Sequence, residues 1–365
     1  MRNKAIVILS FILLAVFSVR VYGDIPQPER DALIELYNST NGDSWKDNSG
    51  WKAEPLHTDG FAMPGTEEDW HGITLSGDHV TEISLVNNNL AGPIPPELGD
   101  LSNLATLDLG YNQLTGEIPV ALGSLKETLT YLSLRDNQLS GEIPAALGNL
   151  ENLTYLNLHI NQLTKIPTEL DKLTNLTYLN LHSNQLNGIP PGLEWGKLSK
   201  LEYLWLNNNP LACNIPPGLG NLSSLIDLDL NSCQLTGSIP QELENLTKLQ
   251  ELKLNKNHLT GSIPEELGNL SNLTKLYLQS NNLKGPIPTS LIYLTGLSET
   301  DIGYNALYTK NTGLITFLDT KDPDWKDTQT IAPEGVNAEA INSTTIKVSW
   351  TPILYTGDTG GYRVF

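Results

Sequence analysis

The stretch TYLNLHINQL (residues 154–163) recurs as TYLNLHSNQL (177–186), with nine of its ten letters unchanged and a start 23 residues later. The underlying pattern, L-x-L-x-x-N-x-L, occurs in ten successive copies, whose first apolar position runs from Ile83 to a degenerate Thr300. Neighbouring copies lie 23 to 25 residues apart. Self-similarity at a period of this length indicates a solenoid in which each copy forms one coil.

Within each copy, apolar and polar residues alternate across the two leucines, which predicts a short strand with one buried face. We expect the copies to pair in parallel, about 4.8 Å apart, around a continuous leucine core. The asparagine is expected to hydrogen-bond the backbone where the chain leaves the strand, because a buried turn needs partners for its polar groups. This Asn ladder comprises Asn88, Asn112, Asn137, Asn161, Asn184, Asn209, Cys233, Asn257, Asn281 and Asn305.

The chain has two cysteines, Cys213 and Cys233, which are few for an exported protein. Stability is therefore not expected to depend on a disulfide framework. Cys233 replaces an asparagine of the ladder and is expected to be a buried structural thiol. A Cys213–Cys233 bridge between adjacent coils is the alternative.

The segments that follow the asparagine are also repeated, as in LTGEIPVALGSL (114–125) and LSGEIPAALGNL (139–150). The composite pattern LxxLxLxxNxLxGxIPxxLGxLxxL resembles the leucine-rich repeat family, in the variant abundant in plant receptor ectodomains, over about 80–310. The resemblance implies an α/β solenoid, a right-handed horseshoe or superhelix. Its concave face would be a parallel sheet and its convex side short 3-10 or helical turns. Because LTKIP (163–167) and LNGIP (186–190) are one residue shorter than LTGEIP, we expect the return strand to break in these two units.

Both ends of the repeat array are expected to carry caps, because terminal coils would otherwise expose their core. Residues 24–79 form the predicted N-terminal cap, with an amphipathic helix over 26–37 and a hairpin turning at 76–78. Trp45, Trp51 and Trp70 are its expected core. This segment resembles the cap of plant-type repeat proteins without its usual cysteines, which favours a bacterial or other non-plant source. Residues 311–326 are predicted to close the array with a helix and Trp325.

The remaining segments lie outside the solenoid. Residues 1–23 are typical of a secretory signal peptide: Arg2 and Lys4 precede an apolar run over 5–19, and cleavage is expected before Asp24. Residues 327–334 read as a linker. Residues 335–365 resemble the opening of a fibronectin type III domain, with the buried tryptophan at Trp350. Because such a sandwich needs about 100 residues, we expect a truncated, poorly ordered partial β-sandwich here.

Composition and motifs exclude several classes of function. The 41 acidic residues outnumber the 22 basic ones, for a net charge of −19, which disfavours nucleic acid and anionic lipid as partners. The sequence has no Gly-rich phosphate loop, no serine nucleophile elbow and no H-E-x-x-H motif. We therefore predict no enzyme, no cofactor and no membrane span in the mature chain. His159 and His182 face the same way, but only Asp136 could add a third ligand, so no metal site is predicted.

Positions between the Leu and Asn columns are left for function. Exposed Tyr and Trp carry binding energy at low entropic cost, and flanking amides suit a peptide or a sugar ring. The candidate ligand-binding residues are Tyr131, Tyr155, Asn157, His159, Tyr178, Asn180, His182, Tyr203, Trp205, Asp229, Lys253 and Tyr277. The alternative is that the tyrosines only fill strand surface and stack across strands.

The sequence favours a secreted or cell-surface module that binds a protein, peptide or glycan on the concave face without catalysis. One alternative is a structural envelope or matrix protein, for adhesion or scaffolding without a specific ligand. Another is the sensor portion of a larger receptor or exported enzyme. No oligomeric state is predicted.

Overall fold

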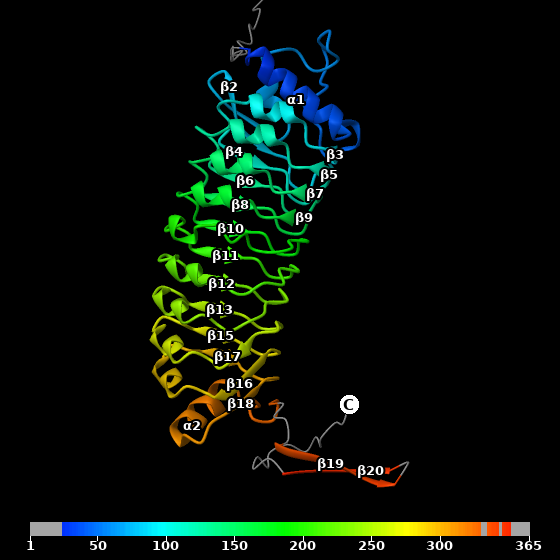
Figure 1. Ribbon diagram of the computed structural model, residues 1–365. Helices are drawn as coiled ribbons and strands as arrows, with labels where there is room; N and C mark the ends of the chain where they lie inside the picture. The colour runs from blue at the N-terminus through cyan, green and yellow to red at the C-terminus, as the bar shows by residue number, and fades with distance from the viewer. Residues whose placement is uncertain (1–23, 330–333, 343–344, 352–365) are drawn as a thin grey trace, which may run out of the picture.

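The computed structural model describes residues 24–329, 334–342 and 345–351. The predicted signal peptide and residues 352–365 of the predicted fibronectin-type segment therefore lie outside the described residues. From α1 to α2 the chain is a single stack of coils (Figure 1).

The concave face is one 11-stranded sheet, with one strand from each of the ten coils and one further strand, β1, from the cap. Its members pair in parallel and in register, so that Leu156 of one coil lies beside Leu179 of the next. The exception is the first pair, which forms the predicted antiparallel hairpin. The strands are β1 (Ile73–Ser76), β2 (His79–Ser84), β4 (Thr106–Asp108), β6 (Tyr131–Ser133), β8 (Tyr155–Asn157), β10 (Tyr178–Asn180), β11 (Tyr203–Trp205), β12 (Asp227–Asp229), β13 (Glu251–Lys253), β15 (Lys275–Tyr277) and β17 (Glu299–Asp301).

The Asn ladder makes the predicted backbone bonds and links each coil to the one before it. Asn161 Oδ1 accepts from the Leu139 N–H of the preceding coil at 3.0 Å. Asn161 Nδ2 donates to the carbonyl of Leu134 in that coil at 3.0 Å, and to Leu158 in its own coil at 3.1 Å. Each ladder amide thus satisfies backbone groups on two coils, which would otherwise be buried without partners.

The residue before each ladder position adopts left-handed backbone geometry in all ten coils, with φ between 51° and 59°. This conformation is costly for residues other than Gly, Asn and Asp. The left-handed column comprises Asn87, Tyr111, Asp136, Ile160, Ser183, Asn208, Ser232, Lys256, Ser280 and Tyr304. Their side chains are varied, so the bend is imposed by the strand and the ladder on either side.

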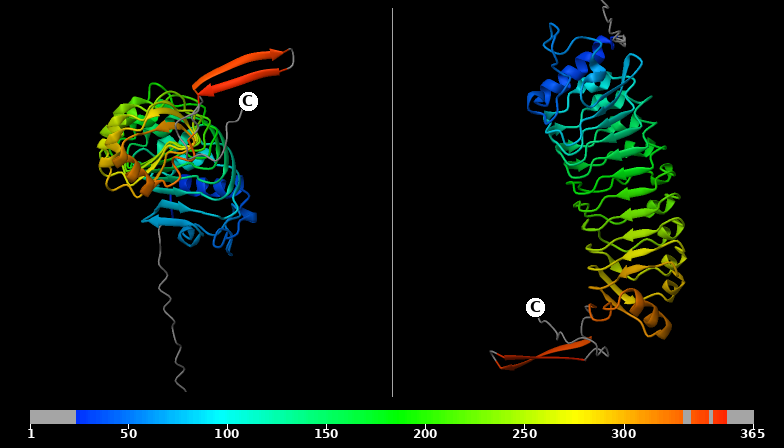
Figure 2. Two further views of the ribbon diagram at one scale, coloured as in Figure 1. Left: turned by 90° about the horizontal axis from the view of Figure 1, so that it is seen from below. Right: turned by 180° about the vertical axis from the view of Figure 1, so that it is seen from behind.

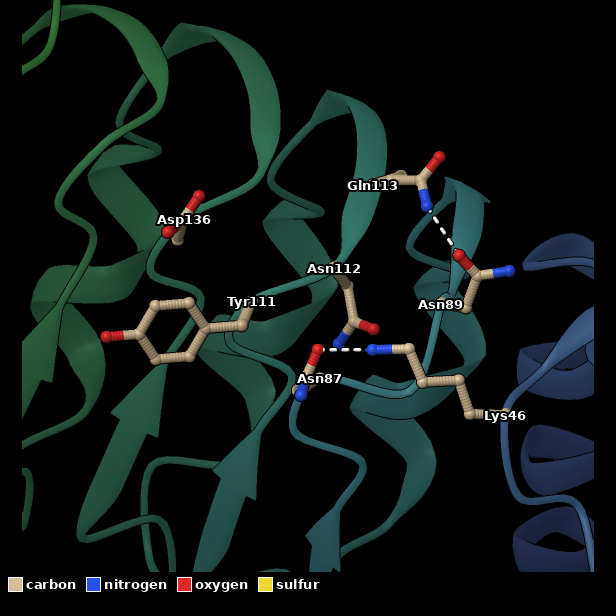
Figure 3. A pocket seen from close by; sticks show the side chains of 7 residues that line it. All are labelled: Lys46, Asn87, Asn89, Tyr111, Asn112, Gln113 and Asp136. Carbon is tan, nitrogen blue, oxygen red and sulfur yellow. Dashed lines mark hydrogen bonds between the residues drawn. The ribbon is translucent and has the colours of Figure 1, made fainter.

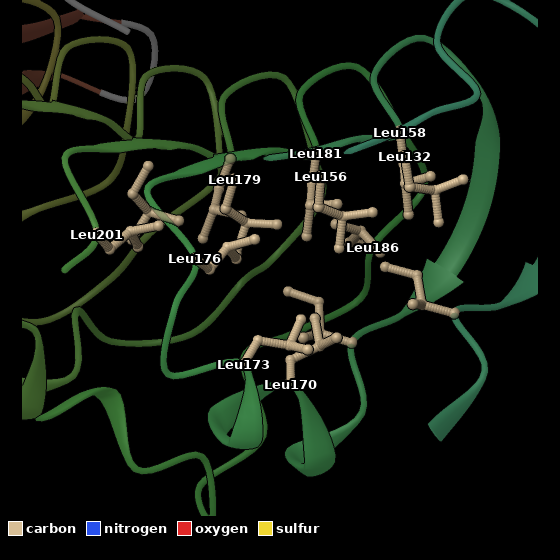
Figure 4. Packing of buried hydrophobic residues seen from close by; sticks show 14 of the residues in the cluster. Leu132, Leu156, Leu158, Leu170, Leu173, Leu176, Leu179, Leu181, Leu186 and Leu201 are labelled. Carbon is tan, nitrogen blue, oxygen red and sulfur yellow. The ribbon is translucent and has the colours of Figure 1, made fainter. Parts of the chain in front are cut away.

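The convex side is built from short 3-10 turns, most of them preceded by the proline of the G-x-I-P pattern. Leu170 and Leu173 from one such turn meet the strand leucines inside the coil (Figure 4), and both are buried. Glycine in the L-G-x-L pattern lets neighbouring turns approach, because a Cβ at Gly123 would overlap the carbonyl of Ala146. The turns are Pro96–Asp100, Val120–Ser124, Ala145–Asn149, Thr168–Lys172, Trp195–Lys197, Pro217–Asn221, Gln241–Asn245, Glu265–Asn269 and Thr289–Tyr293.

The return path carries two smaller parallel sheets separated by a gap. The expected break is confirmed for LNGIP (186–190), where no return strand forms. It is wrong for LTKIP (163–167), where β9 forms and absorbs the missing residue as a register shift opposite Gly141 and Glu142. The strands are β3 (Ala91–Pro93), β5 (Gln113–Glu117), β7 (Gln138–Glu142) and β9 (Gln162–Lys165), then β14 (Thr260–Gly261), β16 (Asn282–Pro286) and β18 (Ala306–Tyr308).

The N-terminal cap confirms the sequence prediction. Helix α1 (Gln27–Ser39) packs on the first coil, with 3-10 turns at Gly42–Ser44 and Glu67–Asp69. Trp45, Trp51 and Trp70 are all buried. The cap also supplies the ladder bonds that a preceding coil would make, because Asp47 exchanges N–H and carbonyl bonds with the Asn88 side chain at 2.7 and 2.8 Å.

The C-terminal cap lies at the opposite end of the stack (Figure 2) and consists of α2 (Thr312–Lys321) with buried Trp325. Gln329 takes the place of an eleventh ladder asparagine. Its Oε1 accepts from Leu307 N–H at 3.0 Å, and its Nε2 donates to the Ile302 carbonyl at 3.1 Å. The last coil therefore keeps its backbone partners although no further repeat follows it.

Both cysteines are free, so the alternative of a Cys213–Cys233 bridge is not realised. Cys233 is the predicted buried thiol, and its Sγ donates to the Leu206 carbonyl at 3.2 Å. A thiol cannot replace the amide oxygen that would accept the Leu211 N–H of the preceding coil. There, Leu211 N–H donates instead to the Asn209 carbonyl at 2.9 Å, and Ala212 turns to a φ of 46°.

After the cap, β19 (Glu334–Asn342) and β20 (Thr345–Thr351) form an antiparallel hairpin, in which Glu339 lies opposite Lys347. These are the two alternating stretches predicted as the first strands of the C-terminal segment.

Candidate ligand-binding surface

Sheet register brings most of the twelve candidate residues into one continuous strip across β6 to β15. Tyr131, Tyr155, Tyr178 and Tyr203 are successive partners in the column that precedes the first strand leucine. The next exposed-facing column runs through Trp205, Asp229, Lys253 and Tyr277 on consecutive strands. The candidates thus share one face of the molecule, as the repeat period predicted.

Three of the four tyrosines form a stack rather than a set of separate platforms, and Tyr203 is tilted by 45° against Tyr178. The rings of Tyr131 and Tyr155 are 4.3 Å apart and nearly parallel, and those of Tyr155 and Tyr178 are 4.4 Å apart. Both faces of Tyr155 are therefore covered by its neighbours. The stack presents ring edges and hydroxyl groups to solvent. Stacking across strands is also the geometry expected if the tyrosines only fill strand surface.

Asn157 and Asn180 were expected on the exposed face, and this expectation is wrong. They are only 2% and 1% exposed, because the tyrosine side chains fold over them. Asn157 Nδ2 donates to the Tyr155 hydroxyl at 3.0 Å, and Asn180 Nδ2 donates to the Tyr178 hydroxyl at 3.2 Å. The two amides support the aromatic layer from below and cannot contact a ligand directly.

His159 and His182 form a second stack beside the tyrosines, with ring centroids 4.4 Å apart. Asn180 Nδ2 lies 3.1 Å from His159 Nδ1, so Nδ1 is the acceptor and Nε2 carries the proton. Burial, together with the adjacent His182 and Arg135, lowers the pKa of His159 to about 4. Burial also lowers the pKa of His182. Near neutral pH the pair is therefore uncharged.

Sequence reasoning missed the charged residues that border the strip at the N-terminal side. Asp108 is buried beside Tyr131, whose hydroxyl donates to Asp108 Oδ2 at 3.3 Å. Arg135 approaches the same carboxylate at 3.5 Å and donates to Ser133 Oγ at 3.0 Å. Opposite charges in neighbouring columns of adjacent strands were the available signal.

At the C-terminal side the strip becomes a chain of ion pairs. Lys253 lies between Asp227 at 3.3 Å and Glu251 at 2.6 Å, and Glu251 also pairs with Lys275 at 2.7 Å. Burial raises the pKa of Asp229, whose Oδ1 accepts from Asn231. Trp205 separates this charged half from the aromatic half, with its ring 5.4 Å from that of Tyr178.

Within residues 24–329 and the two strands beyond them, no cluster of three or more His, Cys, Asp or Glu side chains could hold a metal ion. No helix in that same part of the chain combines the length and the apolar character needed to cross a membrane.

Family models match most of the array. The model of a leucine-rich repeat region matches residues 128–282, and that of the single leucine-rich repeat matches 79–101, 103–125 and 272–294. The chain belongs to the leucine-rich repeat family. The right-handed solenoid predicted from the sequence is the fold of its structural relatives.

Solved relatives include plant receptor ectodomains. The leucine-rich repeat ectodomain of the Arabidopsis thaliana receptor kinase GASSHO1/SCHENGEN3, in complex with CASPARIAN STRIP INTEGRITY FACTOR 2, is 36% identical at a TM-score of 0.69. The match covers 76% of this chain and 33% of the ectodomain chain. The Arabidopsis receptor kinase HAESA, in complex with the peptide hormone IDA and the co-receptor SERK1, is 30% identical at a TM-score of 0.60. The match covers 77% of this chain and 50% of the HAESA chain.

A curated relative, a leucine-rich repeat receptor-like serine/threonine-protein kinase of Arabidopsis thaliana, is 46% identical over 97 residues. These are 26% of this chain and 10% of the kinase. The chain therefore spans a small part of the curated relatives that it matches, and the receptor kinases match it only in their non-catalytic repeat regions.

Proposed function

We propose that this chain is an extracellular recognition module that binds a peptide, or an extended segment of a protein, on the strip from β6 to β11. The observation that carries the proposal is the aromatic layer of Tyr131, Tyr155 and Tyr178, held in place by buried amides. Related ectodomains bound to a peptide hormone support the choice of partner. A preformed rigid layer lowers the entropic cost of binding.

The hydrogen-bonding groups of the strip fit main-chain carbonyls. The Tyr155 and Tyr178 hydroxyls accept from Asn157 and Asn180. The Tyr178 hydroxyl is also engaged with that of Tyr155, so the O–H of Tyr155 is the one left to donate to a ligand. His159 adds an Nε2–H, since its Nδ1 is the acceptor. The strip therefore offers neutral donors. A sugar ring needs an open aromatic face, and the stack has closed both faces of Tyr155.

The test is a linear peptide library displayed on phage and selected on the purified chain. Selected peptides are then titrated against a Tyr155→Phe/Tyr178→Phe double variant, which keeps the stack and removes only the hydroxyls. Losing the hydroxyl hydrogen bonds to the peptide costs about 1–3 kcal/mol, so we expect affinity to fall about fivefold or more. The melting temperature should also fall, because the buried Asn157 amide loses its hydroxyl acceptor, and binding is therefore measured well below the melting temperature of the variant. Tyr293→Phe on the convex side, where the ring is 74% exposed, is the matched control.

Two results would contradict the proposal. If selection yields no peptide above background, the partner is not a linear peptide. If selected peptides bind the double variant as tightly as the parent, the site lies elsewhere on the solenoid.

We propose in addition that residues 1–23 are removed as a signal peptide during export. The charged start and the apolar run over 5–19 support this. N-terminal sequencing of the exported protein is expected to begin at Asp24, and retention of Met1 would contradict cleavage.

We propose further that β19 and β20 are the opening strands of a fibronectin type III-like sandwich. Their antiparallel pairing and the alternation over 335–351 support this. Such a sandwich would act as a spacer beside the recognition module. Amide hydrogen exchange is expected to protect the paired N–H groups of β19 and β20, and fast exchange in both strands would contradict the assignment.

A further inference from the structure

A second surface lies outside the strip, at the rim where the N-terminal cap meets the first three coils. Here a pocket of about 290 Å³ opens beside the left-handed column (Figure 3). We call it the rim pocket, and its lining residues are Lys46, Asn87, Asn89, Tyr111, Asn112, Gln113 and Asp136. The cap loop contributes Lys46 and the coils contribute the rest.

The wall of the rim pocket is fixed by side-chain hydrogen bonds. Lys46 Nζ donates to Asn87 Oδ1, and Gln113 Nε2 donates to Asn89 Oδ1 at 2.6 Å. Asn112 is engaged in the ladder, because its amide serves Leu85 and Leu90. It therefore closes the floor without offering a group to a ligand.

The same bonds leave a mixed set of groups facing the pocket. Asn87 keeps its amide N–H groups, Gln113 keeps its carbonyl oxygen, and Lys46 keeps further N–H groups. Asp136 brings a carboxylate from the third coil. The lining thus offers both donors and acceptors, with one positively and one negatively charged side chain.

Tyr111 provides an aromatic face on the side of the pocket away from the cap. Its ring is 46% exposed. The Arg135 guanidinium lies over the ring, 5.0 Å from its centroid. Among the residues that the structure describes, Tyr111 makes no stacked ring pair of the kind that covers Tyr155, and it lines the pocket, so part of its ring is available to a ligand.

We propose that the rim pocket binds a single pyranose unit of a neutral glycan. Each sugar hydroxyl is both donor and acceptor, which fits the mixed wall, and the C–H face of the sugar ring fits the available part of the Tyr111 ring. Lys46 and Asp136 give the lining no net charge, so it has no overall preference for a charged ligand. Because the volume is at the low end for ligand pockets, one ring fits and a longer oligosaccharide does not.

The experiment uses the purified chain and saturation-transfer NMR with five neutral probes: the methyl glycosides of glucose, galactose, mannose, xylose and N-acetylglucosamine. We expect at least one probe to receive saturation and to bind weakly. Tyr111→Ala and Gln113→Ala should each raise its Kd about fivefold or more. Tyr304→Ala is the matched control, because Tyr304 occupies the same left-handed column, is 59% exposed, and lies in the last coil.

Three outcomes would overturn the proposal: no saturation of any of the five probes, an unchanged Kd in both pocket variants, or an equal loss in the Tyr304→Ala control. Circular dichroism melting of each variant distinguishes lost binding from lost folding. The rim pocket and the peptide strip share no lining residue, although Arg135 contacts Tyr111 on one side and Asp108 on the other. Glycoside binding should survive Tyr155→Phe/Tyr178→Phe, and peptide binding should survive Tyr111→Ala, so the two proposals can fail separately.

Discussion

Replacing Asn161 with alanine removes one rung of the ladder and its bonds to two coils. The Leu139 N–H loses its acceptor, whereas the carbonyls of Leu134 and Leu158 each lose one of two amide donors. They keep Asn137 and Asn184, respectively. The variant therefore leaves one backbone group without a partner and weakens two others. The His159 carbonyl loses only a longer contact of 3.3 Å and keeps the Asp136 N–H.

The expected loss follows from these three groups. A buried N–H without a partner costs about 1–3 kcal/mol, and each weakened carbonyl loses a bond worth about 0.5–1 kcal/mol. We expect the free energy of unfolding to fall by about 2–5 kcal/mol in total. This is a large part of the stability of an ordinary domain.

Equilibrium urea unfolding of Asn161→Ala measures this loss, and Cys233→Ala is the control at the equivalent position of another coil. In that coil Leu211 N–H already bonds to the Asn209 carbonyl, so no N–H loses its acceptor. The control should lose only about 1 kcal/mol, because the bond from Cys233 Sγ is weak. Equal losses in the two variants, or a loss below 1 kcal/mol at Asn161, would refute the reasoning.

Three further predictions concern strain and pH. Ile160→Asn should raise the free energy of unfolding by about 1 kcal/mol in urea titrations. Ile160 has a φ of 51°, which suits Asn and not a β-branched residue. Asn208→Ile, in the same column, should lower the free energy of unfolding by a similar amount. Burial raises the pKa of Asp322 from 3.8 to about 6, so the folded state holds this proton more tightly and stability falls as pH rises from about 4 to 6. Asp322→Asn keeps an acceptor for Ile302 N–H. Its melting temperature should rise relative to that of the parent as pH increases from about 4 to 6. A difference in melting temperature that does not change with pH would contradict the assignment. Burial lowers the pKa of His159 from 6.5 to about 4, so the parent should lose stability as pH falls through that range. His159→Gln should lose less stability over the same range. Identical pH profiles of unfolding for the two proteins would contradict this role of His159.

The sequence predicted the features that every coil shares. Leu156 and Asn161 could be placed inside the coil because their spacing repeats and because nearly every copy has the same residue type at each of the two positions. The register of the concave sheet followed from the same period. The hairpin before the first coil and the buried tryptophans of the cap were also predicted, since turn residues and amphipathic alternation are local signals.

Features that depend on neighbouring coils could not be predicted in the same way. The left-handed column contains Asn, Ile, Lys and Tyr, so its side chains carry no common signal for the backbone bend. Asn157 appeared exposed because its strand position alternates with leucine, yet the adjacent Tyr155 side chain lies over it. The rim pocket joins Lys46 of the cap to Asp136 of the third coil, and no sequence period relates these residues.

The ladder has a direction that bears on how the chain is made. Each amide supports the coil before it, so a coil obtains its full set of backbone partners only when the next asparagine, about one period later, is in place. A ribosome releases the N-terminal coils first, and the newest coil on the emerging chain is always the incomplete one. Gln329 ends this dependence for the last coil. Translation that stops within the array would leave an unfinished coil exposed at the growing end.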